Sequence, residues 1–377
     1  MTNEHRNPPR RRLPCLAALL AVLLSFCLPA FVQAAPPLRT VLVYEGPHID
    51  YYDILINLSR ELKALGIINK APYADAELNG NTEALWRWLS ANAGGTRLTF
   101  LSDGFYSAEY TPDKRSAVTD ALRTRLAKRK DVDLILAFGT WAGLEMTRLD
   151  TDVPVIVCGS TDPIGAGIVP SEKDSGKDNV VAVVETDRFL RQMDLFHQIF
   201  GFRKLGVLYT DTPAGRSCSA LDQIEASCAK NGVELVRCTG NFLENLDTAQ
   251  IAEQMETCHR KLAYQRVDAV FLTYNSLPAA QLPQALKPLM VAGIPLISQT
   301  GPREVQMGAM ASITSYCTQE GRYAAHLITG LLGGAKPRNL PQRLHSPMLL
   351  AINMHSAARI GWNPSLEVLL IVDEFFQ

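Results

Sequence analysis

Short apolar runs alternate along the chain with segments in which apolar residues recur at helical spacing. The run at residues 40–44 is followed by Leu55, Leu58 and Leu62, which lie three or four positions apart. Residues at that spacing share one face of a helix, whereas a short β-branched run is typical of a buried strand. The opening of this region therefore predicts a strand followed by an amphipathic helix.

The same alternation continues to about residue 298. It predicts further strands at 98–101, 133–138, 153–157, 179–184, 205–210, 233–238, 267–274 and 294–298, and helices at 117–130, 187–200, 215–231, 248–265 and 278–292. Near-continuous apolar strands separated by helices are typical of parallel sheets covered on both faces. The series restarts near residue 205, so we expect an α/β fold with two Rossmann-like lobes.

The N-terminus has a different pattern. Arg10, Arg11 and Arg12 precede an apolar run over residues 13–31, and Val32-Gln33-Ala34 then provides the small residues expected at the −3 and −1 positions of a cleavage site. This order predicts a secretory signal peptide over residues 1–34 and a periplasmic location for the remainder. A retained membrane anchor is the alternative, because the run is just long enough to span a bilayer. A lipid anchor on Cys27 is not expected, because bulky Phe26 precedes it.

Composition narrows the function classes. The 377 residues are 47% hydrophobic and 20% charged, which provides enough core material for two domains. The formal net charge of −1 and the absence of a basic stripe argue against a nucleic-acid partner. We expect a monomer.

Export changes the interpretation of the cysteines. Beyond the signal peptide the chain has Cys158, Cys218, Cys228, Cys238, Cys258 and Cys317. Their spacings do not suit a zinc site, and an oxidising compartment allows one or two disulfides. We expect Cys218 to pair with Cys238; buried free thiols are the alternative.

Polar and aromatic residues follow the carboxyl ends of the predicted strands, where open parallel sheets bind their ligands. The candidate ligand-binding residues are Tyr44, Glu45, Thr140, Trp141, Thr161, Asp162, Asp211, Tyr274, Asn275, Gln299 and Tyr316. With the carboxyl ends of the strands of the two lobes facing each other, these residues predict a polar cleft between the lobes.

These candidates divide by chemistry. Trp141 and the three tyrosines offer aromatic surface, and Glu45 and Asp211 offer carboxylates for a ligand ammonium group. Thr161 and Asp162 precede Pro163, so a turn that caps the next helix is the alternative interpretation. Core packing of the aromatic residues and solvated carboxylates are the alternatives for the others.

One part of the chain resembles the periplasmic substrate-binding components of ABC importers. It is the stretch from Val153 to Val157, followed by Thr161-Asp162-Pro163-Ile164-Gly165-Ala166-Gly167-Ile168-Val169. Weaker similarity extends over about residues 133–364. Characterised relatives bind aromatic amino acids. The resemblance implies a type I periplasmic-binding-protein fold, with residues 36–185 and about 316–336 in the N-terminal lobe and 186–315 and about 337–377 in the C-terminal lobe. The segment 74–110, which contains Trp86, departs from the family pattern.

We therefore expect a solute-binding protein that closes over a small polar molecule, foremost an amino acid, and is recognised by an ABC permease. No nucleophile elbow, phosphate loop, metal-binding spacing or dinucleotide fingerprint occurs, so no catalytic residue, metal or cofactor is expected. A ligand-sensing module for a receptor or histidine kinase is the first alternative. An exported α/β hydrolase is the second.

Overall fold

The computed structural model describes residues 36–72, 78, 80–243, 247–275, 277–314 and 317–377, together with Thr2. Residues 37–377 form one compact unit. The expected signal peptide, apart from Thr2, and the candidate ligand residue Tyr316 lie outside the described residues. Among the helices of the described ranges, none has both the length and the apolar character required to cross a membrane.

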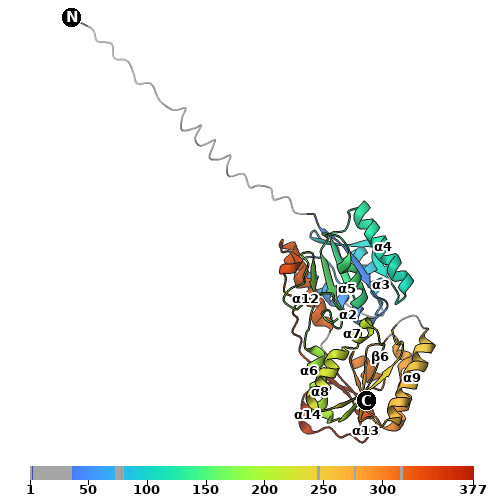
Figure 1. Cartoon of the computed structure of the whole chain (residues 1–377). Helices are drawn as coiled ribbons and strands as arrows, with labels where there is room; N and C mark the ends of the chain where they lie inside the picture. The colour runs from blue at the N-terminus through green and yellow to red at the C-terminus, as the bar shows by residue number, and fades with distance from the viewer. Residues whose placement is uncertain are drawn as a thin grey trace. The chain divides into compact units, whose positions relative to one another are not determined.

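The first lobe, the upper one in Figure 1, is built on a sheet of five parallel strands. The strand order in this sheet is β2-β1-β3-β4-β5. The strands are β1 (Leu38–Tyr44), β2 (Leu98–Ser107), β3 (Leu134–Phe138), β4 (Val155–Cys158) and β5 (Val180–Ala182). Its helices are α2 (Ile49–Ala64), α3 (Thr82–Asn92), α4 (Pro112–Lys128), α5 (Thr140–Arg148) and α12 (Cys317–Leu332).

Alternation along β1 shows why helices cover both faces of this sheet. Leu42 packs in a core that includes residues of α2, α3 and α12, whereas Val41 and Val43 pack in a second core with residues of α4 and α5. Successive side chains of a strand point to opposite faces, so an entirely apolar strand requires cover on both.

The second lobe contains a seven-stranded sheet in the order β12-β11-β10-β9-β8-β6-β7. Its strands are β6 (Lys204–Tyr209), β7 (Glu234–Thr239), β8 (Ala269–Leu272), β9 (Leu296–Ser298), β10 (Ala311–Thr314), β11 (Leu349–Asn353) and β12 (Val372–Phe376). All neighbouring pairs are parallel except β10 and β11, which are antiparallel.

The helices of the second part of the chain are α6 (Arg188–Phe200), α7 (Pro213–Cys218), α8 (Leu221–Asn231), α9 (Thr248–Tyr264), α10 (Leu282–Ala292), α11 (Pro302–Gln306), α13 (Met354–Arg359) and α14 (Leu366–Leu370). Two short 3-10 helices, η1 (Ala279–Gln281) and η2 (Pro337–Asn339), complete the described elements. One core includes residues of α9 and α10, and the other includes residues of α6 and α8.

The structure confirms the predicted α/β class with two lobes and corrects some details. The helix expected at 215–231 is two helices, α7 and α8, because Ala220 adopts a left-handed conformation with φ 49° between them. The antiparallel pair β10–β11 was not expected, and β2 is longer than the predicted strand at 98–101.

The disulfide prediction was wrong. Cys238 bonds to Cys258 rather than to Cys218. Cys238 on β7 and Cys258 on α9 belong to the same hydrophobic core, whereas the Cys218 sulfur lies 3.9 Å from the Thr140 hydroxyl of the first lobe. Within the described residues, Cys158, Cys218 and Cys228 are buried and form no disulfide bond. The side chain of Cys317 lies outside the described part of the chain.

Helices α2 and α12 approach each other at Gly321. A Cβ atom added at Gly321 would lie 2.3 Å from the Ile54 carbonyl oxygen and 2.9 Å from the Leu58 nitrogen. Only a residue without a side chain allows the two backbones to come this close. The preceding residue on α12, Glu320, hydrogen-bonds to the backbone just after β4.

Candidate functional site

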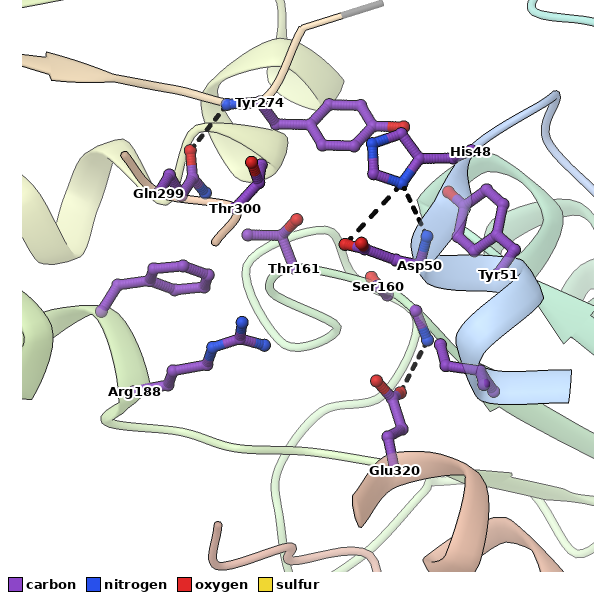
Figure 2. Close-up of a pocket in the computed structure, with 13 residues that line it drawn as sticks. His48, Asp50, Tyr51, Ser160, Thr161, Arg188, Tyr274, Gln299, Thr300 and Glu320 are labelled. Carbon is purple, nitrogen blue, oxygen red and sulfur yellow. Dashed lines mark hydrogen bonds and ion pairs between the residues drawn. The ribbon is translucent and has the colours of Figure 1, made fainter. Parts of the chain in front are cut away.

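A cavity opens where strand ends from both sheets meet (Figure 2). The space among its walls is about 490 Å³, including the part open to solvent. It is lined by His48, Asp50, Tyr51, Ile54, Gly159, Ser160, Thr161, Arg188, Phe189, Tyr274, Gln299, Thr300 and Glu320. Concave sites at which a few polar groups converge are typical of small-molecule sites.

The start of α2 forms one wall of the cavity. His48 is the N-cap residue, and its Nδ1 accepts a hydrogen bond from the Asp50 backbone nitrogen at 3.3 Å. Asp50 lies in the first helical turn, where the positive end of the helix dipole stabilises a carboxylate. The Asp50 Oδ2 is 3.7 Å from the same His48 nitrogen.

Aromatic side chains from both lobes meet at the top of the cavity. The ring of Tyr274 lies 4.8 Å from the ring of His48, and its hydroxyl is 3.0 Å from the hydroxyl of Tyr110. The Tyr51 hydroxyl donates to Glu45 Oε2 at 3.2 Å. Burial raises the pKa of Tyr51, Tyr110 and Tyr274 well above its usual range, so all three remain neutral at physiological pH.

Arg188, the first residue of α6, extends its guanidinium group into the cavity in Figure 2. Its Nη2 donates to the Thr314 hydroxyl at 2.9 Å, and its Cζ lies 5.0 Å from the centre of the Phe189 ring. The Nε atom is buried and has no hydrogen-bond partner within the described structure. A buried unpaired N–H is costly, so an acceptor that reached this donor would stabilise the structure.

Glu320 faces the same cavity from α12. One carboxyl oxygen accepts a hydrogen bond from the Gly159 nitrogen at 2.6 Å. Burial raises the pKa of Glu320 to about 7, although Gly159 and the charge of Arg188 partly oppose the rise. Arg188 and Glu320 both line the cavity, and the positive charge of Arg188 favours the ionised form of Glu320.

Three of the predicted ligand residues line this cavity: Thr161, Tyr274 and Gln299. Both ends of the Gln299 amide are already bonded, because Oε1 accepts from the Tyr274 nitrogen at 2.8 Å and Nε2 donates to the Cys218 carbonyl at 2.9 Å. Gln299 therefore holds Tyr274 in place at the cavity wall.

The Thr140, Trp141 and Asp162 side chains do not line the cavity. Asp162 Oδ1 accepts from the Gly165 nitrogen at 2.8 Å, which is the turn-capping arrangement. Trp141 is 8% exposed and packs in the first-lobe core. The Thr140 hydroxyl lies 3.1 Å from that of Ser160, which does line the cavity.

Four further candidates lie elsewhere in the fold. Glu45 is buried beside Arg115, and the Tyr44 ring packs 5.2 Å from that of Phe105. Asp211 forms a 3.4 Å ion pair with Arg216 outside the cavity. Asn275 Oδ1 accepts from the Leu277 nitrogen at 3.1 Å and so shapes a turn.

The sequence interpretation missed the charged residues of the cavity. The candidates did not include Asp50, Arg188, Glu320 or His48. A usable signal existed, since Arg188 follows β5 and Glu320 follows β10 by a few residues. Within the described ranges, no group of three His, Cys, Asp or Glu residues is arranged to hold a metal ion.

Similar folds occur in solved structures. An ABC domain of Streptococcus pneumoniae in complex with L-Trp aligns with a TM-score of 0.68 and 20% identity, covering 90% of this chain and 100% of that one. A conserved domain protein of Vibrio cholerae aligns with a TM-score of 0.69 and 18% identity, covering 90% and 99%. A ligand-free, open substrate-binding protein of Clostridium difficile aligns with a TM-score of 0.58 and 18% identity, with the same coverage.

No curated protein matches the sequence. The family model described as "ABC transporter substrate binding protein" matches residues 109–374, which is more than half of the chain. This match shows that the chain belongs to the ABC transporter substrate-binding protein family.

Proposed function

We propose that this chain is the periplasmic solute-binding component of an ABC importer and that it binds an amino acid, foremost an aromatic one, without chemical turnover. The observation that carries the proposal is a single cavity lined from both lobes by aromatic rings and by charges of both signs. A zwitterion with an apolar side chain complements such a lining. The L-Trp complex of the Streptococcus protein, which is similar in fold, supports this ligand class.

Closure of the lobes couples binding to transport in this proposal. A ligand that contacts both walls favours the closed form by the difference in its affinity for the closed and open forms. Contacts between the lobes are already present, since the Ser217 hydroxyl donates to the Asp162 carbonyl oxygen at 3.2 Å and Tyr110 meets Tyr274. The permease would recognise the closed form.

Tyr110→Phe is expected to weaken L-tryptophan binding about fivefold. It removes the hydroxyl that meets Tyr274 but keeps the ring that packs over Gly46, so the closed form loses about one hydrogen bond. Isothermal titration measures the change. Tyr264→Phe, at an exposed tyrosine outside the cavity, is the matched control and leaves the dissociation constant unchanged.

A thermal-shift screen tests the proposed function. Amino acids, sugars, purines and short peptides are added to the purified chain without its first 34 residues. At a tenfold excess over its dissociation constant, a bound ligand raises the free energy of unfolding by about 1.4 kcal/mol. We expect L-tryptophan and other apolar amino acids to raise the melting temperature and sugars and purines to leave it unchanged.

Variants outside the cavity serve as controls for this screen. Asp211→Asn and Asp162→Asn change carboxylates that do not line the cavity, so both proteins should keep the full shift. A shift produced by a sugar or purine and by no amino acid would contradict the proposed ligand class.

A further inference from the structure

We propose that Arg188 binds the carboxylate of the ligand and that Glu320 binds its ammonium group. On this assignment the site accepts free α-amino acids and rejects molecules in which either group is blocked or missing. The inference rests on the proposed function and adds to it the residues that select the substrate class.

Arg188 has unused hydrogen-bonding capacity directed at the cavity. Thr314 occupies Nη2, and no acceptor among the described residues engages the buried Nε. The ring of Phe189 flanks the guanidinium group on one side. A carboxylate accepts two parallel hydrogen bonds from a guanidinium group, so it supplies the acceptor that Nε lacks.

Glu320 is suited to the opposite end of an amino acid. Gly159 bonds to one carboxyl oxygen, and among the described residues that is the one hydrogen bond that Glu320 makes. Asp50 lines the same cavity and places a second carboxylate there. An ammonium group has three donors, which Glu320 and Asp50 can share.

The arrangement in Figure 2 leaves a defined place for the ligand side chain. Arg188 and Glu320 lie together at one end of the cavity, and Tyr274 and His48 lie at the other. A ligand held by its two charged groups therefore directs its side chain toward the aromatic rings. Flat apolar side chains fit there because rings pack favourably against rings.

The test compares three probes that differ only in these groups: L-tryptophan, tryptamine, which lacks the carboxylate, and indole-3-propionate, which lacks the amino group. A second set uses L-leucine with 3-methylbutylamine and 4-methylpentanoate. Isothermal titration at pH 8 measures each dissociation constant for the wild type, Arg188→Gln and Glu320→Gln. Asp211→Asn is the matched control, because its carboxylate lies outside the cavity.

The wild type is expected to bind the free amino acid at least about 30-fold more tightly than either analogue. Arg188→Gln should bind the amino acid about 30-fold more weakly than the wild type does, and its affinity for tryptamine should change little. Glu320→Gln should likewise bind the amino acid more weakly by this factor, and its affinity for indole-3-propionate should change little. Retained binding of the analogue shows that each variant is folded. Arg188→Lys keeps the positive charge but not the geometry for two parallel hydrogen bonds, so its affinity for the amino acid should lie between those of Arg188→Gln and the wild type.

Two negative results are distinguishable. A wild type that binds the amino acid, the amine and the des-amino acid equally well would overturn the assignment of Arg188 and Glu320 alone. Variants that bind the amino acid as the wild type does would overturn the same assignment. A wild type that binds neither L-tryptophan nor L-leucine would overturn the proposed function and this inference together.

Discussion

Amino-acid binding by the wild type should weaken about 100-fold between pH 8 and pH 5. Burial raises the pKa of Glu320 to about 7 in the ligand-free chain, and a bound ammonium group would favour the ionised carboxylate. Affinity is therefore full above pH 7 and falls about tenfold for each pH unit below it, because protons compete with the ligand. Isothermal titration with L-tryptophan across this range measures the effect.

The same coupling predicts that binding near pH 7 releases a proton. Titrations in buffers of different ionisation enthalpy detect that release. The amino acid itself stays a zwitterion throughout the range, so the change belongs to the protein.

Several charged or titratable groups surround Glu320 and affect its ionisation. Arg188 and Glu185 approach it from the segment around the start of α6, Asp50 from α2, and the Cys158 thiol from β4. Glu320→Gln removes the proposed titrating group and should flatten the profile. His48→Gln is the control, because histidine side chains change charge in the same pH range. A profile that flattens in His48→Gln but persists in Glu320→Gln would assign the effect to His48 instead.

Trp86→Ala is expected to lower the free energy of unfolding by about 3–5 kcal/mol. The Trp86 side chain is fully buried in the first-lobe core, its ring packs edge-on against Phe100 at 5.2 Å, and its Nε1 donates to the Leu101 carbonyl at 2.9 Å. Alanine leaves a large cavity and an unpaired carbonyl. Urea unfolding monitored by circular dichroism gives the change.

Trp88 supplies the matched control for this prediction. It lies two residues away on α3 and is only partly buried, so Trp88→Ala should cost clearly less. Neither tryptophan lines the cavity, and both variants should bind L-tryptophan as the wild type does while they remain folded. A loss of stability below about 1 kcal/mol for Trp86→Ala would contradict the role of this residue in the core.

The two-lobe fold could be predicted from the sequence because its strands are nearly all apolar. Val41, Leu42 and Val43 each occupy a core on one face or the other, and such runs leave little ambiguity about a doubly covered parallel sheet. The division between α7 and α8 could not be predicted, since the helical pattern continues through Ala220 and only its backbone conformation interrupts it.

The site could be predicted only in part. Strand ends locate the cavity, and Thr161 and Tyr274 do line it. Whether a polar side chain faces a ligand depends on local bonds that residue type does not reveal: Asp162 caps its own turn, whereas Glu320 joins Gly159 across 161 positions of sequence. Long-range pairings of this kind, like the Cys238–Cys258 bond, require the packing of the helices to be known.

Gly321 links the packing of α12 on α2 to the geometry of the cavity. Because it seats α12 directly on the backbone of α2, it also sets how far the adjacent Glu320 reaches toward Gly159. A bulkier residue at position 321 would push α12 away from α2 and move the Glu320 carboxylate with it. The identities of the residues that line the cavity would be unchanged. A substitution at Gly321, which does not itself line the cavity, is therefore expected to change the position of a carboxylate that does.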